Sequence, residues 1–534
     1  MRMSKKAGAL ILAAMLGAGV LAGCGQSSGN SGSGSSADSS AASSGTEKAS
    51  TGEKILVCGS TGYFAQETLD PASGWDGWYW QYDGVLETLF QLDNSYAPQK
   101  VLVEDYKKVD DVTWEFTIKD NVKFQNGENV TAESVKKCFE RTLKINDRAK
   151  EQIYFDSITA KGQVLTIKTK EPNPTLLNDL TDPLWTVYDS ENSDFKNTVY
   201  GTGPYIVDSF NPGVEIDLVR FDDYWGGTPK IDKVVCKQIG DADALAMAVQ
   251  NKEIDIAAPM PSSGIPIFQG KEGFVVDSVL SARCNSLDYN MKSKTVGDFA
   301  VRKAIAMTID REGICSQIYA GLATPSYGFF PESFAYGGTD GMDLDVKSRD
   351  VEGAKKVLEE AGWVDSDGDG IREKDGVKLS AKMVVLASRK ELAQIGDVMQ
   401  SDLKDIGMDL KVDTLESTDG AMKKADMELS TFNMSPTGNA QYYFNTRLVT
   451  GASGNEGGYS NKEFDALAKK LEGTFDENER NQIIKDATKI VMDEHGVDVI
   501  LHQKLTYVYN DEVKNFTARP SEYYLIDGNI DLDR

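Results

Sequence analysis

Few residues in this sequence are arranged in the way that catalytic groups usually are. The only histidines are His495 and His502, both near the C-terminal end. The sequence has no His-Glu-x-x-His pair, no phosphate-binding Gly-x-x-x-x-Gly-Lys loop and no complete Gly-x-Gly-x-x-Gly turn. Direct binding of a transition metal through imidazole would need one of the two histidines, and we expect both to be structural. Carboxylates are plentiful, so hydrolysis by a pair of acidic residues remains an open alternative.

An acidic run at 365–370, Asp-Ser-Asp-Gly-Asp-Gly, has metal-binding character. It resembles the start of an EF-hand calcium loop, in which the twelfth position carries a bidentate glutamate. Position twelve is Gly376 here, and the loop lacks the flanking paired helices of that motif. We therefore interpret the run as a polar turn and predict no metal site.

Aromatic and arginine residues are better suited to binding a solute. The chain carries a cluster of aromatic residues at Trp75, Trp78, Tyr79 and Trp80. Such side chains offer a large contact area at a low cost in conformational entropy. Arg283 and Arg447 are the cations that we expect to hold a ligand carboxylate, because a guanidinium fork matches it bidentately. The alternative for each arginine is a structural or surface ion pair.

The N-terminal residues have the pattern of an export signal. Three basic residues precede an apolar stretch at 7–22, which is shorter than the roughly 20 residues that span a bilayer comfortably. The stretch ends in Leu-Ala-Gly-Cys, which resembles the bacterial lipobox. That resemblance implies that residues 1–23 are a signal peptide and that Cys24 carries lipid on its sulfur and its new amino group. The alternative is a plain signal peptide with an incidental cysteine.

Residues 24–53 are interpreted as a flexible tether. They are nearly all Ser, Gly, Ala, Asn and Thr, and such a segment cannot bury enough apolar surface to offset its ordering entropy. The body that follows exceeds the roughly 250–300 residues at which a single core stops growing. We therefore expect two or three lobes behind the tether.

Composition argues against several functional classes. The chain has 57 basic and 83 acidic residues and a formal charge of −26, so we expect no non-specific binding to nucleic acid. Five cysteines follow Cys24, an odd number, and no Cys-x-x-Cys pair occurs. Zinc and thioredoxin-like sites are therefore poorly supported. Cys58 and Cys236 lie in strand-like runs and could be sheet neighbours, and we expect buried free thiols.

Strand-like and helix-like segments alternate along the body, which predicts an α/β fold class. Thr131, with Ser134 at the third helical position, predicts the start of a helix. Another helix is predicted over Tyr82–Phe90. Two separate strands, Val497–Leu501 and Thr506–Tyr509, are predicted near the end of the chain.

Several segments, read together and in order, carry a family resemblance. They are TLDPA at 68–72, VLETL at 85–89, WEFTI, VKF, NGE and TAESV between 114 and 135, GTGPY at 201–205, DYWGG at 223–227, VRKAI at 301–305, IDR at 309–311, EAGW at 360–363 and DGDG at 367–370. In this order and spacing the chain resembles family 5 of the bacterial extracellular solute-binding proteins. The resemblance covers nearly the whole body.

The resemblance implies a two-lobed α/β fold of the periplasmic-binding-protein type, with an additional subdomain and a hinge between the lobes. Lobe I would comprise 54–88, 189–283 and 505–534, the extra subdomain 89–188, and lobe II 284–504. The chain would cross between the lobes near Cys284 and Lys504. Closure of the hinge would then enclose a ligand.

The resemblance also locates candidate ligand contacts. The stretch that leads into the family's first helix tends to face the cleft, which favours Trp75 and Tyr79. In peptide-binding relatives the segment equivalent to 432–443 usually carries an acidic residue for the ligand's amino terminus. Here the segment has no Asp or Glu, and Asn439-Ala440 replaces the frequent Asp-Pro. The predicted ligand-binding residues are Trp75, Trp78, Tyr79, Trp185, Arg283, Asn285, Phe432, Asn433, Tyr442 and Arg447.

These observations predict a substrate-binding lipoprotein of an ABC importer, with no catalytic residues and no cofactor. Its expected partners are a short peptide or peptide-like solute, the permease subunits and, through the lipid, a membrane. We expect a monomer in the bacterial cell envelope, outside the cytoplasm. A nickel or metal-chelate binding protein of the same family is the alternative for the ligand. A lipid-anchored secreted hydrolase and a surface adhesin are alternatives of other classes.

Overall fold

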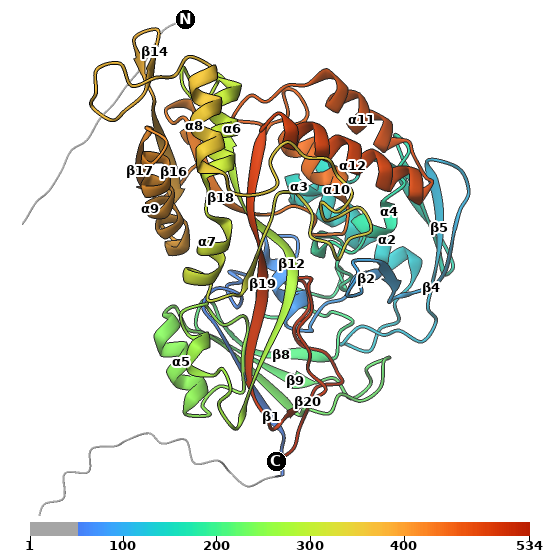
Figure 1. The fold of residues 1–534 in the computed structure, drawn as a ribbon. Helices are drawn as coiled ribbons and strands as arrows, with labels where there is room; N and C mark the ends of the chain where they lie inside the picture. The colour runs from blue at the N-terminus through green and yellow to red at the C-terminus, as the bar shows by residue number, and fades with distance from the viewer. Residues whose placement is uncertain (1–51) are drawn as a thin grey trace, which may run out of the picture. The chain divides into compact units, whose positions relative to one another are not determined.

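Two long strands, β12 (Phe274–Tyr289) and β19 (Val497–Asn510), run antiparallel through the centre of the structure and connect its two halves (Figure 1). They belong to a computed structural model that describes residues 52–534. The predicted signal peptide, Cys24 and nearly all of the predicted tether lie outside the described residues. Between residues 52 and 534 no helix is both long and apolar enough to cross a membrane.

The two long strands lie in the middle of an 11-stranded mixed sheet. The other strands of the sheet are β1 (Ile55–Ser60), β8 (Tyr205–Asn211), β9 (Glu215–Arg220), β10 (Lys233–Gln238), β11 (Ile256–Ala257), β13 (Ala323–Pro325), β16 (Ser380–Leu386), β17 (Asp409–Leu415) and β18 (Met427–Asn433). Their order is β17-β16-β18-β12-β19-β11-β1-β10-β9-β8, with β13 paired to β19. The sheet therefore continues from one half to the other through β12 and β19.

A separate four-stranded antiparallel sheet is formed by the strands that lie between β3 and β8 in the sequence. It has the order β4-β5-β7-β6 and consists of β4 (Val103–Lys108), β5 (Thr113–Ile118), β6 (Phe155–Lys161) and β7 (Val164–Thr169). Three two-stranded hairpins or ribbons complete the strands: β2 (Phe90–Leu92) with β3 (Pro98–Lys100), β14 (Glu373–Lys374) with β15 (Val377–Lys378), and β20 (Val513–Lys514) with β21 (Asp531–Leu532).

Helices cover the sheets and line their edges (Figure 1). The α-helices are α1 (Asp76–Tyr82), α2 (Ala132–Ile145), α3 (Asp147–Gln152), α4 (Leu176–Asp179), α5 (Ala242–Gln250), α6 (Phe299–Thr308), α7 (Arg311–Gln317), α8 (Val351–Glu360), α9 (Lys390–Lys404), α10 (Ala440–Tyr443), α11 (Lys462–Glu472) and α12 (Glu477–Asp493). Short turns of 3-10 helix are η1 (Pro183–Trp185), η2 (Ile265–Ile267) and η3 (Ala421–Lys423), and η4 (Phe444–Leu448) is a π-helical turn.

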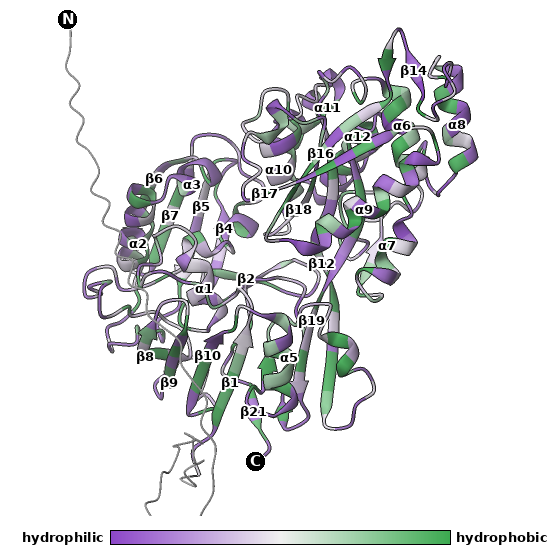
Figure 2. Cartoon of the chain, turned by 90° about the vertical axis from the view of Figure 1, so that its left-hand side faces the viewer, coloured by the Kyte–Doolittle hydropathy of each residue, from purple (hydrophilic) through white to green (hydrophobic). Residues whose placement is uncertain are grey.

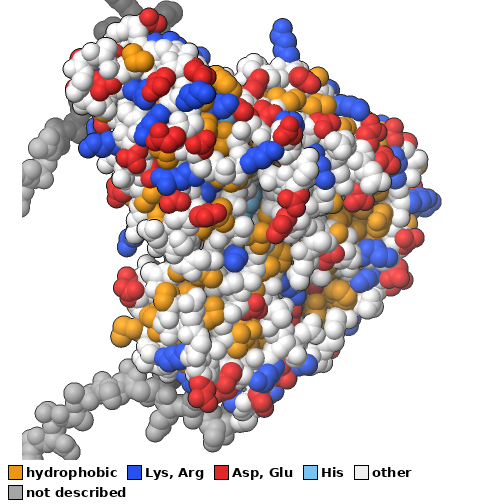
Figure 3. Space-filling view, viewed as in Figure 1, with side chains coloured by type: hydrophobic (Ala, Val, Ile, Leu, Met, Phe, Trp, Pro, Cys, Tyr) orange, Lys and Arg blue, Asp and Glu red, His pale blue; other side chains and the backbone are white. Residues whose placement is uncertain are grey.

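Apolar side chains gather in several distinct cores. Helices and strands alike carry both apolar and polar residues in the hydropathy view (Figure 2). One core draws its buried residues almost wholly from 56–86, 188–258 and 505–532. Another lies within 287–429 together with the end of β19 near Leu501. A third is confined to 89–187 and includes the buried face of α2, which packs against the four-stranded sheet. Charged residues of both signs are interspersed over the surface (Figure 3).

The predicted start of α2 is confirmed in detail. The Ser134 backbone N–H donates to Thr131 Oγ1 at 3.1 Å, and the Thr131 N–H donates to Ser134 Oγ at 2.9 Å. The two residues thus form a reciprocal capping box. The sequence signal was sufficient here because capping depends only on neighbouring residues.

Two sequence-based predictions of elements were wrong. The structure has no helix over Tyr82–Phe90. The helix of this region, α1, lies earlier and ends at Tyr82, and Gly84 then takes a left-handed φ of 75°. Val85 and Leu86 are fully buried in an extended segment, so their apolar spacing did not distinguish helix from strand. The two strands predicted at the end of the chain form one continuous strand, β19.

The cysteine predictions agree with the structure. Cys58 and Cys236 are direct register partners on the parallel strands β1 and β10. All five cysteines of the described residues are buried and free. Burial raises the pKa of the Cys58 thiol well above its ordinary value, so it remains protonated at neutral pH.

Candidate ligand-binding site

Trp78 is the centre of an aromatic cluster at α1. Its ring stacks on Tyr79 with centroids 5.4 Å apart and meets Trp75, Tyr63 and Tyr523 edge-on at 5.8–6.3 Å. The indole Nε1 donates to the backbone oxygen of Glu522 at 2.7 Å. The cluster therefore joins α1 to the C-terminal segment of the chain.

Local contacts fix the position of α1. The Asp76 carboxylate accepts hydrogen bonds from the backbone N–H groups of Glu67 and Thr68 and from the Thr68 hydroxyl, at 2.6–3.0 Å. A Cβ atom at Gly77 would lie 2.8 Å from the Pro183 carbonyl oxygen, so only glycine permits this close approach. The helix is thereby held directly against η1.

A small cavity opens beside Trp78 and brings opposite charges together. Trp75, Trp78, Arg148, Asp182 and Tyr523 contribute to its walls. The Arg148 guanidinium lies over the Trp75 ring, 3.3 Å from the centroid. The free space is about 20 Å³, enough for one water molecule. A larger solute would enter only if the surrounding elements moved apart.

Asp182 is the buried acid of this cavity. Its Oδ1 accepts the Leu184 N–H at 2.9 Å, and its Oδ2 lies 3.4 Å from the Tyr523 hydroxyl that donates to it. Burial raises the pKa of the Asp182 carboxyl, while Arg148 acts in the opposite direction. A cationic group placed beside Asp182 would further favour the ionised form.

Tyr442 of α10 lies near the charged groups of this cavity. Tyr442 is 38% exposed, and its pKa is raised by burial and by the nearby Asp182 charge, with Arg148 and Arg447 opposing. Arg447 lies over the ring of Phe432 at 4.6 Å. Of the predicted site residues, Trp75 and Trp78 line the cavity and Tyr79 stacks on Trp78, whereas Phe432, Tyr442 and Arg447 are not among its walls.

The segment that lacks an acidic residue makes direct contacts with α4. The Asn439 amide donates to Thr175 Oγ1 at 2.9 Å and to Asp179 Oδ1 at 3.1 Å. Asn178 Nδ2 donates to the Thr437 carbonyl oxygen at 2.8 Å. Asn439 is therefore engaged in joining two parts of the fold, and its amide is not free for a solute.

Arg283 is occupied by an internal partner. Its Nε and Nη2 donate to the two carboxylate oxygens of Glu522, each at 2.6 Å. Burial of Glu522 acts to raise its pKa, but the Arg283 guanidinium outweighs this effect and holds the pKa below its usual value. The pair lies where the β12–β19 register is interrupted, between Leu280 and Cys284.

Three other predicted site residues lie away from the cavity wall. Trp185 is fully buried between Phe139 and Phe155, and its Nε1 donates to Gln152. Asn285 is also fully buried, and its amide is bonded to Thr431, Tyr319 and Gln503. Asn433 is half-buried opposite Arg283 in the β12–β18 register. Trp185 and Asn285 therefore have structural contacts that account for their polar groups.

Two half-buried carboxylates lie within electrostatic range of Arg447. Asp288 and Glu428 are register partners on β12 and β18. Burial raises the pKa of Glu428 to about 7, and the charge of Asp288 adds to the effect while Arg447 opposes it. This pair makes the wall beneath Arg447 sensitive to pH.

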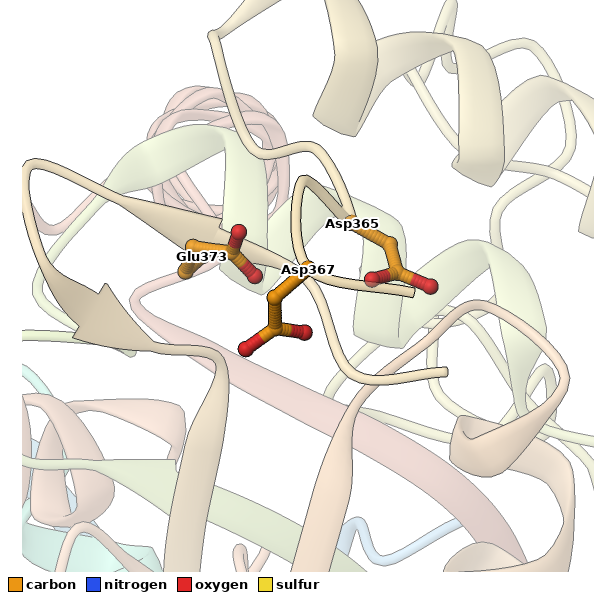
Figure 4. Close-up of side chains that lie close together, drawn as sticks. All are labelled: Asp365, Asp367 and Glu373. Atoms are coloured by element: carbon orange, nitrogen blue, oxygen red, sulfur yellow. The ribbon is translucent and has the colours of Figure 1, made fainter. Parts of the chain in front are cut away.

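Neither the acidic run nor the histidines contribute to the cavity. Asp365, Asp367 and Glu373 lie close together at the β14 hairpin, well exposed or half-exposed (Figure 4). Lys378 forms ion pairs with Asp367 and Asp369 there, so the Lys378 ammonium already offsets part of the negative charge of the loop.

The two histidines are buried separately. His495 is hydrogen-bonded to Asp498 at 2.9 Å, and His502 to the Gly328 carbonyl oxygen at 3.1 Å. Burial lowers the pKa of His502 to about 4.

Sequence reasoning missed Arg148, Asp182, Tyr523 and Glu522. They come from segments far apart in the chain, and no motif surrounds them. The only local signal is Asp182 before Pro183, which resembles an ordinary helix start with Pro at the first position.

Comparisons with known proteins place this architecture among extracytoplasmic binding proteins. The profile described as "Bacterial extracellular solute-binding proteins, family 5 Middle" matches residues 97–456. Nickel-binding protein NikA of Staphylococcus aureus is 30% identical over 455 residues, which is 84% of this chain and 90% of that protein. Dipeptide-binding protein DppE of Bacillus subtilis is 24% identical over 515 residues, covering 89% of this chain and 92% of that protein.

A solved structure extends the likeness to three dimensions. The crystal structure of NikA from Staphylococcus aureus in complex with Ni(L-His)2 superimposes with a TM-score of 0.75 at 28% identity. The match covers 90% of this chain and 100% of that chain. It confirms the predicted two-lobed α/β fold class.

Proposed function

The chain belongs to family 5 of the bacterial extracellular solute-binding proteins, and we propose that it captures a short peptide or peptide-like solute between its lobes. Members of the family are substrate-binding proteins of ABC transporters. The chain is therefore a binding component that works outside the cytoplasm, and it is not an enzyme. This membership decides against the hydrolase and adhesin alternatives.

The proposed lobes follow the separate apolar cores. We assign 54–88, 189–283 and 505–534 to lobe I, 89–188 to the subdomain and 284–504 to lobe II. The core boundaries near 88, 188, 286 and 505 support this division, and a further core joins the three parts through residues such as Tyr96, Phe444 and Tyr523. β12 and β19 would act as the hinge, because they are the long strands whose register is broken where they pass between the two cores.

The presence of Arg148 and Asp182 on the walls of one aromatic cavity, where α1 and the C-terminal segment meet the proposed subdomain, carries the proposal about the solute. A short peptide or an amino acid has a carboxylate and an ammonium group, and these two side chains offer one complementary charge for each. Asp182 would supply from the subdomain the acidic group that 432–443 lacks. Trp75, Trp78, Tyr79, Phe432 and Tyr442 would provide contact area, and Arg447 a second cation.

A nickel chelate is the second candidate. The relative that is 30% identical is named a nickel-binding protein, and its solved structure holds Ni(L-His)2. A chelate of that kind presents amino-acid groups to the protein and needs no histidine from it. This fits a site in which both histidines of the chain are buried elsewhere.

The anchor and partners complete the proposal. We infer that lipid on Cys24 and the tether at 24–53 hold a monomeric body near the membrane, where the closed form would dock on the permease subunits. The sequence pattern of 1–24 supports the anchor. Labelling cells with a fatty-acid analogue should mark the wild-type chain and leave a Cys24→Ala chain unlabelled.

The first test of the solute is native mass spectrometry of the purified protein, with metal analysis of the same sample. A series of adducts that denaturation releases as peptides would support the peptide proposal. One adduct that contains nickel with organic ligands would overturn it in favour of the chelate. A bare mass would lead to a thermal-shift screen of both classes, in which a genuine ligand stabilises the protein by mass action.

A further inference from the structure

A second and larger cavity lies at the other end of α1. The first cavity adjoins Trp75 and Trp78 in the N-terminal half of this helix, whereas the second adjoins Gln81 at its C-terminal end. The C-terminal segment divides in the same way, with Tyr523 at the first cavity and Tyr524 at the second. The second cavity measures about 290 Å³, close to the lower limit of small-molecule pockets at roughly 300 Å³.

Positive charge prevails at the second cavity, although the chain as a whole is strongly acidic. Lys100 and Lys230 line it, both are exposed, and neither forms an ion pair within residues 52–534. The Lys100 ammonium donates one hydrogen bond to the Glu104 carbonyl oxygen and keeps two further protons for a ligand. Arg519 is paired with Asp527 at 2.8 Å, so these two charges offset each other. The free charge on the walls is therefore contributed by two lysines.

The remaining acid of the cavity is already saturated with donors. Glu87 accepts hydrogen bonds from the Tyr224 hydroxyl at 2.7 Å and from Trp225 Nε1 and Thr202 Oγ1, each at 2.9 Å. Lys119 lies over the Trp225 ring, 4.3 Å from its centroid. Glu87 thus orients two aromatic walls of the cavity and is not available to bind a cation.

Gln81 adds an unpaired polar group to the wall. The residue is 4% exposed, and its amide has no hydrogen-bond partner of good geometry within residues 52–534, although the Tyr524 side chain lies close enough to interact with it. An unpaired buried donor or acceptor is costly in free energy. A molecule that brings a donor and an acceptor to this wall would relieve that cost.

We propose that this cavity is a second binding site, specific for a small organic carboxylate that also carries an amide. The carboxylate would lie between Lys100 and Lys230, the amide towards Gln81, and the body of the molecule against Trp225 and Tyr524. This site is separate from the first cavity, so the proposal does not depend on which solute the first cavity binds. Steering by the lysines favours an anion over a neutral molecule of the same shape.

The test compares N-acetylglycine with its neutral counterpart N-acetylglycinamide, by saturation-transfer NMR on the purified protein. We expect saturable binding of N-acetylglycine, tighter by about tenfold than the neutral compound, because charge-assisted hydrogen bonds contribute about that much. The Lys100→Gln/Lys230→Gln variant should lose this preference. Both lysines are exposed, so the fold should be retained, which circular dichroism would check.

Two control variants test whether the compound binds at this cavity. Lys107→Gln removes an exposed lysine that does not line the cavity and should leave binding unchanged. Arg148→Gln reports any N-acetylglycine that binds at the first cavity, and the preference for the charged compound should persist in this variant. Equal binding of the charged and neutral compounds, no saturable binding at millimolar concentration, or loss of binding only in Arg148→Gln would each overturn the proposal.

Discussion

Arg148 and Asp182 illustrate how single side chains would determine which solute the first cavity accepts. Each is half-buried or buried beside aromatic rings, where water screens charges less than at the surface. A ligand group of matching sign would gain a charge-assisted hydrogen bond, and a group of the wrong sign would be repelled. Arg283 is a poor candidate for a ligand contact by comparison, because its guanidinium already donates two hydrogen bonds to the Glu522 carboxylate.

Arg148→Gln should weaken binding of the natural solute by about tenfold or more, because it removes one charge-assisted hydrogen bond. Lys150→Gln is the matched control, since Lys150 is exposed on the same helix, two residues away, and pairs only with Asp147. Isothermal titration calorimetry of the three proteins would measure the effect. Equal losses in both variants would contradict a role for Arg148 in the site.

Glu428→Gln should change how stability depends on pH. The pKa of Glu428 is raised from 4.5 to about 7, so the wild-type protein loses stability as the pH rises from about 4.5 to 7 and the buried carboxyl ionises. The variant lacks this loss. Its free energy of unfolding should therefore rise by about 2 kcal/mol relative to wild type between pH 5 and pH 8, which is less than the pKa shift alone implies because the group is partly solvated.

Urea denaturation at pH 5 and pH 8 would measure this difference. The exposed Glu128→Gln variant is the control for a general effect of losing one negative charge. A Glu428→Gln protein whose stability relative to wild type is the same at both pH values would rule out ionisation of this group as the cause.

At the scale of elements, the sequence predicted what depends on neighbouring residues and missed what depends on tertiary contacts. The cap of α2 was predictable because Thr131 and Ser134 are close in sequence and form hydrogen bonds with each other. The segment after α1 was not, because Val85 and Leu86 are apolar for a reason that lies in distant packing partners. A Cβ at Gly203 would lie 2.3 Å from the Gly84 carbonyl oxygen, which shows how closely these remote segments approach.

Thr131→Ala should destabilise the protein by about 1 kcal/mol, because the Ser134 N–H loses its capping acceptor. Thr131→Ser keeps a hydroxyl at the same place and should remain within a few tenths of a kcal/mol of wild type. The midpoint of urea unfolding, read by circular dichroism, would distinguish them. Equal destabilisation by both substitutions would mean that packing of the Thr131 methyl group matters more than the cap.

At the scale of the whole molecule, the first cavity is assembled from parts that no local pattern connects. α1, the loop before η1, helix α3 and the C-terminal segment each supply one or two residues to its wall. The family resemblance supplied the fold, the transporter role and the aromatic residues of α1. It did not supply Asp182 or Tyr523, because their roles depend on how the subdomain and the chain end are placed.

The Arg283–Glu522 pair should matter for the stability of the whole molecule. Glu522→Ala leaves a buried guanidinium without its partner and should cost about 3–5 kcal/mol. The double variant Arg283→Met/Glu522→Leu removes both charges and should recover most of that loss. Denaturant unfolding of the single and double variants would test this, and a double variant no more stable than the single one would contradict it.

The pairing of β12 with β19 has a consequence for how the chain is made. The hydroxyl groups of Ser278 and Thr506, 228 positions apart, are hydrogen-bonded to each other. β1 pairs with β11, which in turn pairs with β19, so β1 is connected to the centre of the sheet only through these later strands. Contacts so distant in sequence form late, because a long loop must close first. We therefore expect a nascent chain to stay incompletely folded until its last segment emerges from the ribosome. Such a delay would keep the polypeptide loose enough to be threaded through a narrow export channel.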